Sequence, residues 1–289
     1  MVDRLKKVLE RKDTSSTLAA VIGSPVVHSL SPLLHNAAFK SLEMEWEYVA
    51  LEITETELQE VFECMRSGDL GGLSVTMPFK TKTASLVDRC TPTAAALNAV
   101  NCVVSTEEGL IGHNTDGDGF LNGLIHDTHF DPRDKKAVVI GAGGAARAVI
   151  EALSRSGAAS ITVINRTLER AESAADLAGK IGRVGTSEDI SEADLVVNAT
   201  SLGMKDSVEA LPCSVELLHP NQLVVDLIYH PLETLWISKT KQKGINSYNG
   251  VSMLLFQAVE AFTLWTGKEA PISVMQSAIT QELKERTNK

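Results

Sequence analysis

Three polar clusters in the first half of the chain contain the side chains needed to bind a small acid rich in hydroxyl groups. Residues 28–32 (HSLSP) place two hydroxyls beside a predicted helix start, and residues 74–80 (SVTMPFK) place Ser, Thr and Lys directly after a predicted strand. Asn98, Asn101 and residues 113–117 (HNTDG) add amides and one carboxylate. Once water is excluded, each oxygen of such a ligand needs a fixed hydrogen-bond partner. The clusters therefore predict a site for a polyhydroxylated carboxylic acid.

Lys80 and Asp116 supply the amine and the carboxylate of these clusters. A positioned ammonium can donate a proton to the alkoxide that develops when a carbonyl is reduced. A neighbouring carboxylate would raise the pKa of the lysine, whereas burial would lower it, so Lys80 is either a general acid or chiefly an electrostatic clamp on the alkoxide. His28 and His113 are further acid–base candidates, but each lies beside a residue whose role is better defined.

Each cluster by itself also has a structural explanation. Ser-x-Ser-Pro is a common helix start, Asn-Thr-Asp-Gly forms turns readily, and a lysine that follows a proline is often a surface residue. The occurrence of all the clusters in one chain is what favours a substrate site.

A glycine-rich turn in the second half of the chain has the pattern of a dinucleotide site. It follows an apolar strand, opens a helix, and fits G-x-G-x-x-G/A with Gly141, Ala142, Gly143, Gly144, Ala145 and Ala146. The first glycine permits a tight turn, the second lets the backbone approach a pyrophosphate, and the small last residue keeps helix and strand close. The helix start then binds the phosphates through its amides and positive dipole. Because similar turns also occur as plain packing, the strand–turn–helix context carries the prediction.

The end of the following strand distinguishes between the two nicotinamide cofactors. An NAD site usually has an acidic residue there to hold the ribose 2′-hydroxyl. This chain instead has Asn165, Arg166 and Thr167, with Arg170 one helical turn later. Two guanidiniums can pair with a 2′-phosphate, although both could also be solvated charges at a helix start. Without an acid to repel the phosphate, the pattern favours NADP over NAD.

Apolar periodicity predicts the strands and helices that carry these groups. Strands are predicted at residues 18–22, 46–51, 73–76, 99–105 and 110–114 (the last two as a hairpin), 137–140, 161–164, 195–198 and 223–227. Helices are predicted from a Ser31 cap with Pro32 in the first helical position, over residues 56–67, after Pro78 through Asp88, and over residues 168–179 and 250–265. This alternation predicts an α/β chain of two domains, namely an N-terminal α/β substrate domain with a mainly parallel sheet and a Rossmann-type NADP-binding domain.

Composition and charge narrow the class of protein. The 289 residues are 44% hydrophobic and 22% charged, which suits a folded chain of two domains. A net charge of −10 disfavours binding to nucleic acid or anionic membranes. The four cysteines form no CxxC pair, so neither a metal site nor a disulfide framework is expected. Since there is no signal-peptide pattern and no apolar run of about 18 residues, the expected location is cytoplasmic.

In this order the motifs resemble those of the shikimate dehydrogenase family, from residue 20 to the C-terminal helices. The matching segments are residues 29–32, 74–80, 99–101, 112–117, 141–147, 165–167, 198–204, 226–229 and 250–257. The V-T-x-P-x-K and N-T-D-G segments are specific, whereas the glycine turn is not. One departure is Ser74, which stands where many members have asparagine.

The resemblance implies a role for each matching residue. Ser29 and Ser31 would hold the substrate carboxylate, and Lys80 and Asp116 would be the catalytic pair. The groups near the substrate ring would be Ser74, Thr76, Asn101, Asp116, Tyr229 and Gln257. The cofactor would be bound by residues 141–146 with Asn165, Arg166, Thr167 and Arg170, and its nicotinamide would lie among Thr200, Ile228, Gly250 and Met253.

The resemblance further implies the reversible, NADP-dependent reduction of 3-dehydroshikimate to shikimate, a step of chorismate and aromatic amino acid biosynthesis. Residues 1–117, completed by helices within 250–289, would form the substrate domain, and residues 118–249 the NADP domain. A monomer or homodimer without a metal is expected. The alternatives are a quinate or dual quinate/shikimate dehydrogenase, a non-catalytic NADP or shikimate sensor, and an unrelated two-domain NADP oxidoreductase.

Overall fold

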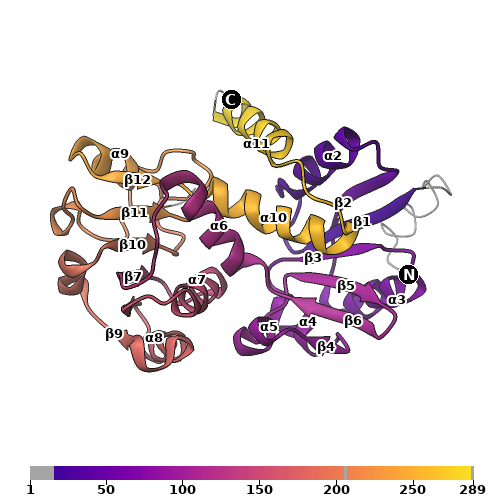
Figure 1. Ribbon diagram of the computed structural model, residues 1–289, viewed down its shortest axis with the longest axis horizontal. Helices are drawn as coiled ribbons and strands as arrows, with labels where there is room; N and C mark the ends of the chain where they lie inside the picture. Colours follow the sequence, from indigo (N-terminus) through magenta and orange to yellow (C-terminus); the bar gives the residue numbers. More distant parts are fainter. Residues whose placement is uncertain (1–15, 205–206, 288–289) are drawn as a thin grey trace. The chain divides into compact units, whose positions relative to one another are not determined.

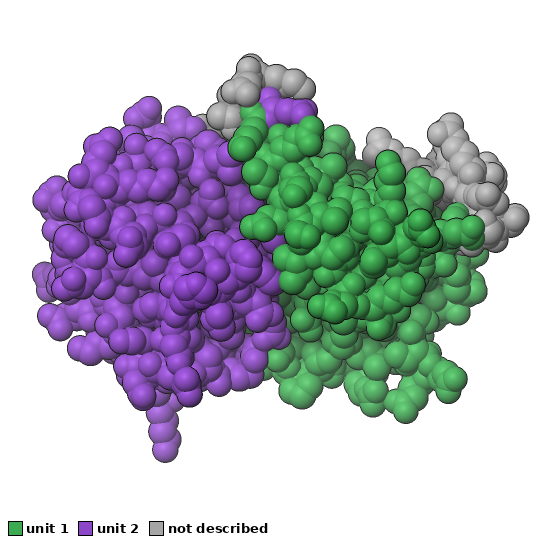
Figure 2. Space-filling view, turned by 45° about the horizontal axis from the view of Figure 1, so that its top comes forward, with its two compact units in different colours: residues 1–115, 258–284 green, residues 116–257, 285–289 purple. Residues whose placement is uncertain are grey.

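The structure is a computed structural model that describes residues 16–204 and 207–287. The chain divides into two compact units, each built on its own sheet. The first unit comprises Met1–Thr115 and Ala258–Lys284, and the second comprises Asp116–Gln257 and Glu285–Lys289; Figure 2 colours them separately. None of the described helices is long and apolar enough to cross a membrane.

The first unit contains a six-stranded mixed sheet. Its strands are β1 (Thr17–Gly23), β2 (Trp46–Glu52), β3 (Gly72–Val75), β4 (Arg89–Cys90), β5 (Cys102–Thr106) and β6 (Gly109–His113). They lie in the order β2-β1-β3-β5-β6-β4, with β1 parallel to β2 and β3, β4 parallel to β6, and β5–β6 as an antiparallel hairpin. Its helices include α2 (Ser31–Ser41), α3 (Leu58–Ser67), α4 (Lys80–Ala84) and α5 (Pro92–Leu97). The predicted α/β class and the hairpin are confirmed.

The start of α2 differs from the predicted cap. Leu30 occupies the N-cap position and makes no side-chain cap bond, and Ser31 is the first helical residue. The Ser29 hydroxyl instead accepts a hydrogen bond from the Ser31 backbone N at 3.2 Å. The prediction that Ser31 caps this helix is therefore wrong, because the helix starts one residue earlier, where Leu30 O accepts the first helical hydrogen bond from Leu34 N at 3.2 Å.

An aromatic cluster forms part of the core of the first unit. The His35 ring lies against the rings of Tyr48 and Trp265, with centroids 4.4 and 5.1 Å away. The Trp265 indole donates to Val103 O at 3.0 Å and packs on Gly72, where a Cβ would be 2.6 Å from the indole ring. Burial lowers the pKa of His35 to about 3, so the ring is neutral at pH 7. The cluster fixes Tyr48 in the sheet.

The second unit contains a fully parallel sheet (Figure 1). Its strands are β7 (Lys136–Ile140), β8 (Ser160–Ile164), β9 (Gly182–Val184), β10 (Leu195–Asn198), β11 (Leu223–Asp226) and β12 (Asn246–Tyr248). Their order, β12-β11-β10-β7-β8-β9, is that of the Rossmann fold, which confirms the predicted class. Its helices include α6 (Asp116–Thr128), α7 (Gly144–Arg155), α8 (Leu168–Ala175) and α9 (Leu235–Gln242). The helix α10 (Val251–Thr266) is divided between the two units after Gln257, and α11 (Ile272–Thr287) belongs mainly to the first unit. Ligands of such sheets bind at the carboxyl ends of the strands, where the order reverses, here between β7 and β10.

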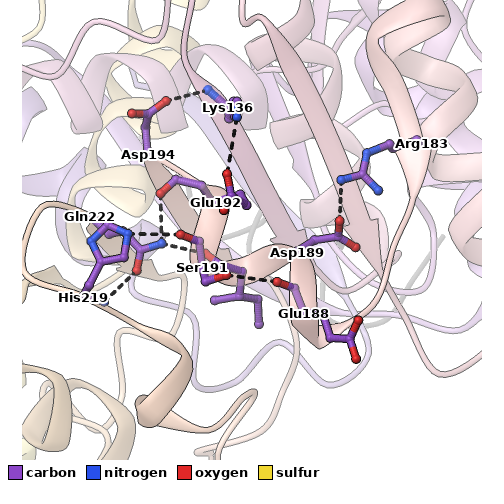
Figure 3. A network of polar contacts seen from close by, with 11 residues as sticks. Lys136, Arg183, Glu188, Asp189, Ser191, Glu192, Asp194, His219 and Gln222 are labelled. Carbon is purple, nitrogen blue, oxygen red and sulfur yellow. Dashed lines mark hydrogen bonds and ion pairs between the residues drawn. The ribbon is translucent and has the colours of Figure 1, made fainter.

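A polar network holds the amino ends of these parallel strands (Figure 3). Gln222, which is 1% exposed and precedes β11, donates to the carbonyls of Ile190 and Ala193 at 2.6 and 2.9 Å. Asp194, which precedes β10, accepts a hydrogen bond from the Lys136 backbone N at the start of β7, at 2.8 Å. Because ligands bind at the opposite ends of the strands, we interpret this network as structural.

Replacing Gln222 with leucine is expected to lower the free energy of unfolding by about 1–3 kcal/mol, because two buried carbonyls lose their donor. Equilibrium urea unfolding measures the loss, and NADPH affinity of the folded protein should not change. Asn221→Ala, at the exposed neighbouring position, is the control and should leave stability unchanged. A Gln222→Leu protein as stable as the wild type would contradict the structural role.

Candidate active site

The carboxyl ends of β1 and β3 are held together in the first unit. Ser24 N donates to Met77 O at 3.0 Å, and Thr76 N donates to Ile22 O at 2.9 Å. Gly23 makes this approach possible, since a Cβ there would be 2.3 Å from Thr76 Cγ2. The loop that leads to α2 therefore starts beside the segment that leads to α4, which brings two of the polar clusters together.

Lys80 and Asn101 lie on backbone segments that are bonded to one another. Lys80 is the first residue of α4, and its carbonyl accepts a hydrogen bond from Val100 N at 2.9 Å, while Asn101 O accepts one from Val75 N at 2.8 Å. The Asn101 side chain is 4% exposed and is fixed by Thr115. Its Oδ1 accepts from Thr115 N at 2.8 Å and its Nδ2 donates to Thr115 Oγ1 at 3.0 Å. Thr115 thus orients the side-chain amide of Asn101, which is predicted to contact the substrate.

Tyr48 is a candidate site residue that the sequence reasoning missed. It is 1% exposed, and its hydroxyl lies beside the hydroxyls of Ser31 and Ser74, which are each 9% exposed. Among the described residues this hydroxyl has no hydrogen-bond partner of ordinary geometry, and burial raises the pKa of Tyr48. A buried donor without a partner, next to two serine hydroxyls, suits an anionic oxygen. No local motif marks Tyr48, because it reaches the serines from β2 rather than from the loops that carry the motifs.

Asp116 begins α6 in the second unit and is 8% exposed. Two glycines allow α6 to pack closely on other helices of this unit. A Cβ on Gly117 would be 2.8 Å from Ala148 O of α7, and a Cβ on Gly119 would be 2.6 Å from Gln257 N of α10. Asp116 and Gln257, both predicted to contact the substrate, therefore lie on helices in direct contact.

The glycine turn after β7 leaves room for a pyrophosphate. Gly141 has a φ of +119°, and a Cβ there would be 2.7 Å from Ala199 O, so glycine is required. Gly143 and Gly144 are exposed, and apart from their chain neighbours and the backbone of α7 itself, no described atom lies within 4 Å of a Cβ placed on either. No side chain caps α7, so the first amides of this helix are available to phosphate oxygens. Ala146 is fully buried and keeps α7 close to the sheet.

Arg166 and Arg170 lie where β8 ends and α8 begins. Both side chains are exposed, and within residues 16–204 and 207–287 neither has a hydrogen-bond or ion-pair partner. Asn165 Nδ2 donates to Thr167 O at 2.9 Å and shapes the turn that presents them. Two unpaired guanidiniums without a nearby acidic partner suit a 2′-phosphate.

The residues predicted to surround the nicotinamide come from three segments of the second unit. Thr200 Cγ2 lies 3.3 Å from the position of a Cβ on Gly141. Gly250 N donates to Ile228 O at 3.0 Å, which joins the start of α10 to the segment after β11. Met253 lies one turn further along α10. Thr200 therefore borders the glycine turn, whereas Ile228 and Gly250 lie beyond the end of β11.

The predicted site residues divide between the two units. The first unit contains Ser29, Ser31, Ser74, Thr76, Lys80 and Asn101, and the second contains Asp116, Tyr229, Gln257 and the predicted cofactor residues.

Burial raises the pKa of Tyr229, which follows β11 and is partly buried. The described part of the chain contains no group of three or more potential metal ligands.

Three family models match the chain. The shikimate dehydrogenase substrate binding domain matches residues 21–103, and the shikimate / quinate 5-dehydrogenase model matches residues 125–212. The shikimate 5′-dehydrogenase C-terminal domain matches residues 250–280. The first two matches include the hydroxyl clusters and the glycine turn, respectively.

Individual proteins are similar over nearly the whole chain. The shikimate dehydrogenase (NADP(+)) of Moorella thermoacetica is 42% identical over 93% of this chain and 94% of its own. Shikimate 5-dehydrogenase from Thermus thermophilus, solved with NADP(H) and shikimate, is 37% identical with a TM-score of 0.84 over 92% of this chain and 99% of that one. Quinate dehydrogenase from Corynebacterium glutamicum, solved with NAD, is 29% identical with a TM-score of 0.85 over 92% and 99%. The chain therefore belongs to the shikimate dehydrogenase family.

Proposed function

We propose that this chain catalyses the reversible, NADP-dependent reduction of 3-dehydroshikimate to shikimate, a step of chorismate biosynthesis. The observation that carries the proposal is the full-length similarity to NADP-dependent shikimate dehydrogenases, because it spans the hydroxyl clusters and the glycine turn together. A quinate dehydrogenase is less favoured, since the compared quinate enzyme is less similar and was solved with NAD.

The substrate carboxylate binds at the start of α2. Ser29, Ser31 and Tyr48 donate hydroxyl hydrogens to it, and the positive end of the α2 dipole favours the anion. The ring hydroxyls are contacted by Thr76, Asn101, Asp116 and Gln257, with Ser74 and Tyr229 nearby. Ser74 stands where many family members have asparagine. Because serine is shorter, it reaches less far toward the substrate, and the preference for particular ring hydroxyls beside Ser74 can differ from that of those members.

The Tyr48→Phe substitution is expected to raise KM for shikimate roughly 5- to 20-fold with little effect on kcat, because one hydrogen bond to a charged group is lost. Steady-state kinetics with varied shikimate measure this. The thermal midpoint should not fall, since the Tyr48 hydroxyl has no partner within the described residues. An unchanged KM would exclude Tyr48 from the carboxylate site.

Lys80 and Asp116 carry the proton chemistry. Bound NADPH supplies the hydride that reduces the C3 carbonyl. Lys80 donates a proton from Nζ to the developing alkoxide, and accepts it back from the hydroxyl in the oxidation direction. Asp116 orients the ammonium and accepts a hydrogen bond from a neighbouring substrate hydroxyl.

The second unit has the features that NADP requires. The amides at the start of α7 bind the pyrophosphate, and Gly143 and Gly144 leave space for it. Arg166 and Arg170 pair with the 2′-phosphate, next to Asn165 and Thr167. Thr200, Ile228, Gly250 and Met253 would surround the nicotinamide.

Two domain assignments stay predictions. Residues 1–117, with helices within 250–289, are predicted to bind the substrate, and residues 118–249 are predicted to bind NADP. The structural units place residues 116–117 and 250–257 with the Rossmann sheet. A cytoplasmic location and a monomeric or homodimeric state are likewise predictions.

The proposal is tested by following NADPH absorbance with shikimate and NADP, and then with quinate and with NAD. We expect the highest kcat/KM for shikimate with NADP. A higher value for quinate with NAD would make the chain a quinate dehydrogenase. Binding of both ligands without any NADPH formation would make it a sensor.

A further inference from the structure

A buried polar network joins the carboxyl ends of β10 and β11 in the second unit. Asn198 and Asp226 are the last residues of these strands, lie opposite each other in the parallel register, and are both 0% exposed. Asn198 Nδ2 donates to Asp226 Oδ1 at 2.9 Å. Ile228 N also donates to Oδ1, at 3.2 Å, and the Thr234 hydroxyl donates to Asp226 Oδ2 at 2.7 Å. One buried carboxylate thus receives three hydrogen bonds.

This arrangement exceeds what the local fold requires. Thr234 caps α9 by accepting a hydrogen bond from Ile237 N at 3.3 Å, and this cap needs no acid. Burial raises the pKa of Asp226, and the three hydrogen bonds lower it. Because an apolar pair at the two strand ends would avoid burying a carboxylate, the network points to a role beyond stability.

The network fixes the loops that follow both strands. Asn198 Oδ1 accepts two hydrogen bonds from Thr200, from the backbone N at 3.0 Å and from Oγ1 at 2.7 Å. Asp226 holds the backbone of Ile228 in the same way from the other strand. Gly203, which has a φ of +107°, packs against Ile228 and Thr234. A Cβ on Gly203 would be 3.3 Å from both Ile228 Cδ1 and Thr234 Cγ2. Thr200 and Ile228 are therefore set relative to each other by buried side chains.

The loop after β10 borders the glycine turn, and the loop after β11 is bonded to the start of α10. A Cβ on Gly141 would be 2.7 Å from Ala199 O and 3.3 Å from Thr200 Cγ2. Ile228 O accepts a hydrogen bond from Gly250 N at 3.0 Å. Arg166, just after the end of β8, makes no hydrogen bond or ion pair with the network among the described residues. The network thus supports one end of the cofactor site and leaves the 2′-phosphate end to other residues.

We infer that Asn198, Asp226 and Thr234 are positioning residues that hold the wall of the nicotinamide pocket for hydride transfer. The inference rests on the proposed placement of Thr200 and Ile228 at the nicotinamide. Hydride transfer requires the reacting atoms to be about 3–3.5 Å apart, and small displacements of the donor lower its rate steeply. Loosening the network should therefore lower the rate of hydride transfer and weaken the positioning of the nicotinamide half of the cofactor. Binding of the adenosine half should not change.

The first variant is Thr234→Val, which keeps the shape of the side chain and removes both the donor to Asp226 Oδ2 and the oxygen that caps α9; Asp226→Asn, which leaves this cap in place, separates the two effects. Hydride transfer is measured in single turnovers with saturating ligands, using NADPH and NADPH deuterated at the transferred position. The rate is expected to fall roughly 10- to 100-fold with a larger isotope effect. The dissociation constant of 2′-phospho-ADP-ribose, which lacks nicotinamide, should not change. Thr234→Ser, which restores the hydroxyl, should recover most of the rate.

Thr240→Val is the matched control. Thr240 lies in α9, the helix that Thr234 caps, and is 0% exposed. Its hydroxyl donates to Ile237 O at 2.8 Å and accepts from Ser247 Oγ at 2.6 Å, outside the network. It should leave the hydride-transfer rate unchanged. Should Thr234→Val fold poorly, Asp226→Asn removes the charge at constant shape and should slow hydride transfer in the same way.

The inference is overturned by a wild-type hydride-transfer rate in Thr234→Val or Asp226→Asn, by an equal loss in Thr240→Val, or by parallel loss of 2′-phospho-ADP-ribose binding. A wild-type protein that fails to oxidise shikimate with NADP would instead refute the proposed function. The two failures are therefore distinguishable.

Discussion

The Lys80→Ala protein is expected to turn over shikimate roughly 10²- to 10⁴-fold more slowly than the wild type, because the alkoxide loses its positioned proton donor. NADPH binding should persist, since Lys80 belongs to the first unit and the predicted cofactor residues belong to the second. Absorbance assays give kcat, and fluorescence titration gives the dissociation constant of NADPH. Near-normal turnover would remove Lys80 from the mechanism.

Two further substitutions sharpen this result. Lys82→Ala removes a lysine from the same short helix, where it pairs with Glu55 at the surface, and should leave turnover unchanged. Lys80→Arg keeps the positive charge but cannot release a proton near neutral pH. Substantial activity in Lys80→Arg would identify the side chain as an electrostatic clamp, whereas loss comparable to Lys80→Ala would identify a general acid.

Replacing both Arg166 and Arg170 with alanine is expected to lower the preference for NADP over NAD roughly 100-fold, about 10-fold for each charge-assisted hydrogen bond to the 2′-phosphate. Both guanidiniums are exposed and unpaired within the described residues, so their removal leaves no buried group without a partner. The ratio of kcat/KM for the two cofactors measures the effect. KM for NAD, which lacks this phosphate, should hardly change.

A matched control is Arg133→Ala, which removes an exposed arginine paired with Asp131. It should leave the cofactor preference as it is. If the double variant keeps the wild-type ratio, the two arginines are ordinary surface charges. If KM rises equally for both cofactors, they act on the shared part of the dinucleotide.

The Rossmann unit was predictable because its signals are local. Strands β7, β8, β10 and β11 are short apolar runs, and the turn at residues 141–146 stands between a strand and a helix. Gly141 must be glycine because of its positive φ and its contact with Ala199. Such a requirement is visible in the sequence as a glycine at a fixed spacing.

Short elements were less predictable. The helix predicted after Pro78 through Asp88 ends at Ala84 and is followed by β4. The helix predicted over residues 168–179 is α-helical to Ala175 and continues as a 3-10 helix (Asp176–Ile181) that is broken at Gly179. Gly179 there has a φ of +56°, outside the helical region. Elements of one or two turns gain little from their own hydrogen bonds, so packing against the sheet decides their length.

The amino-acid sequence by itself determined the chemistry of the motifs, from Ser29 and Lys80 to the glycine turn and Arg166, because each depends on residues a few positions apart. The tertiary structure alone decided that Tyr48 reaches Ser31 and Ser74, that Thr115 orients Asn101, and that Asp226 meets Asn198 and Thr234. These contacts join residues from different strands and loops, and their spacing in the chain varies from 8 to 28 positions. The register of the sheets, together with the packing of helices and loops on them, brings such groups side by side, which no local pattern encodes.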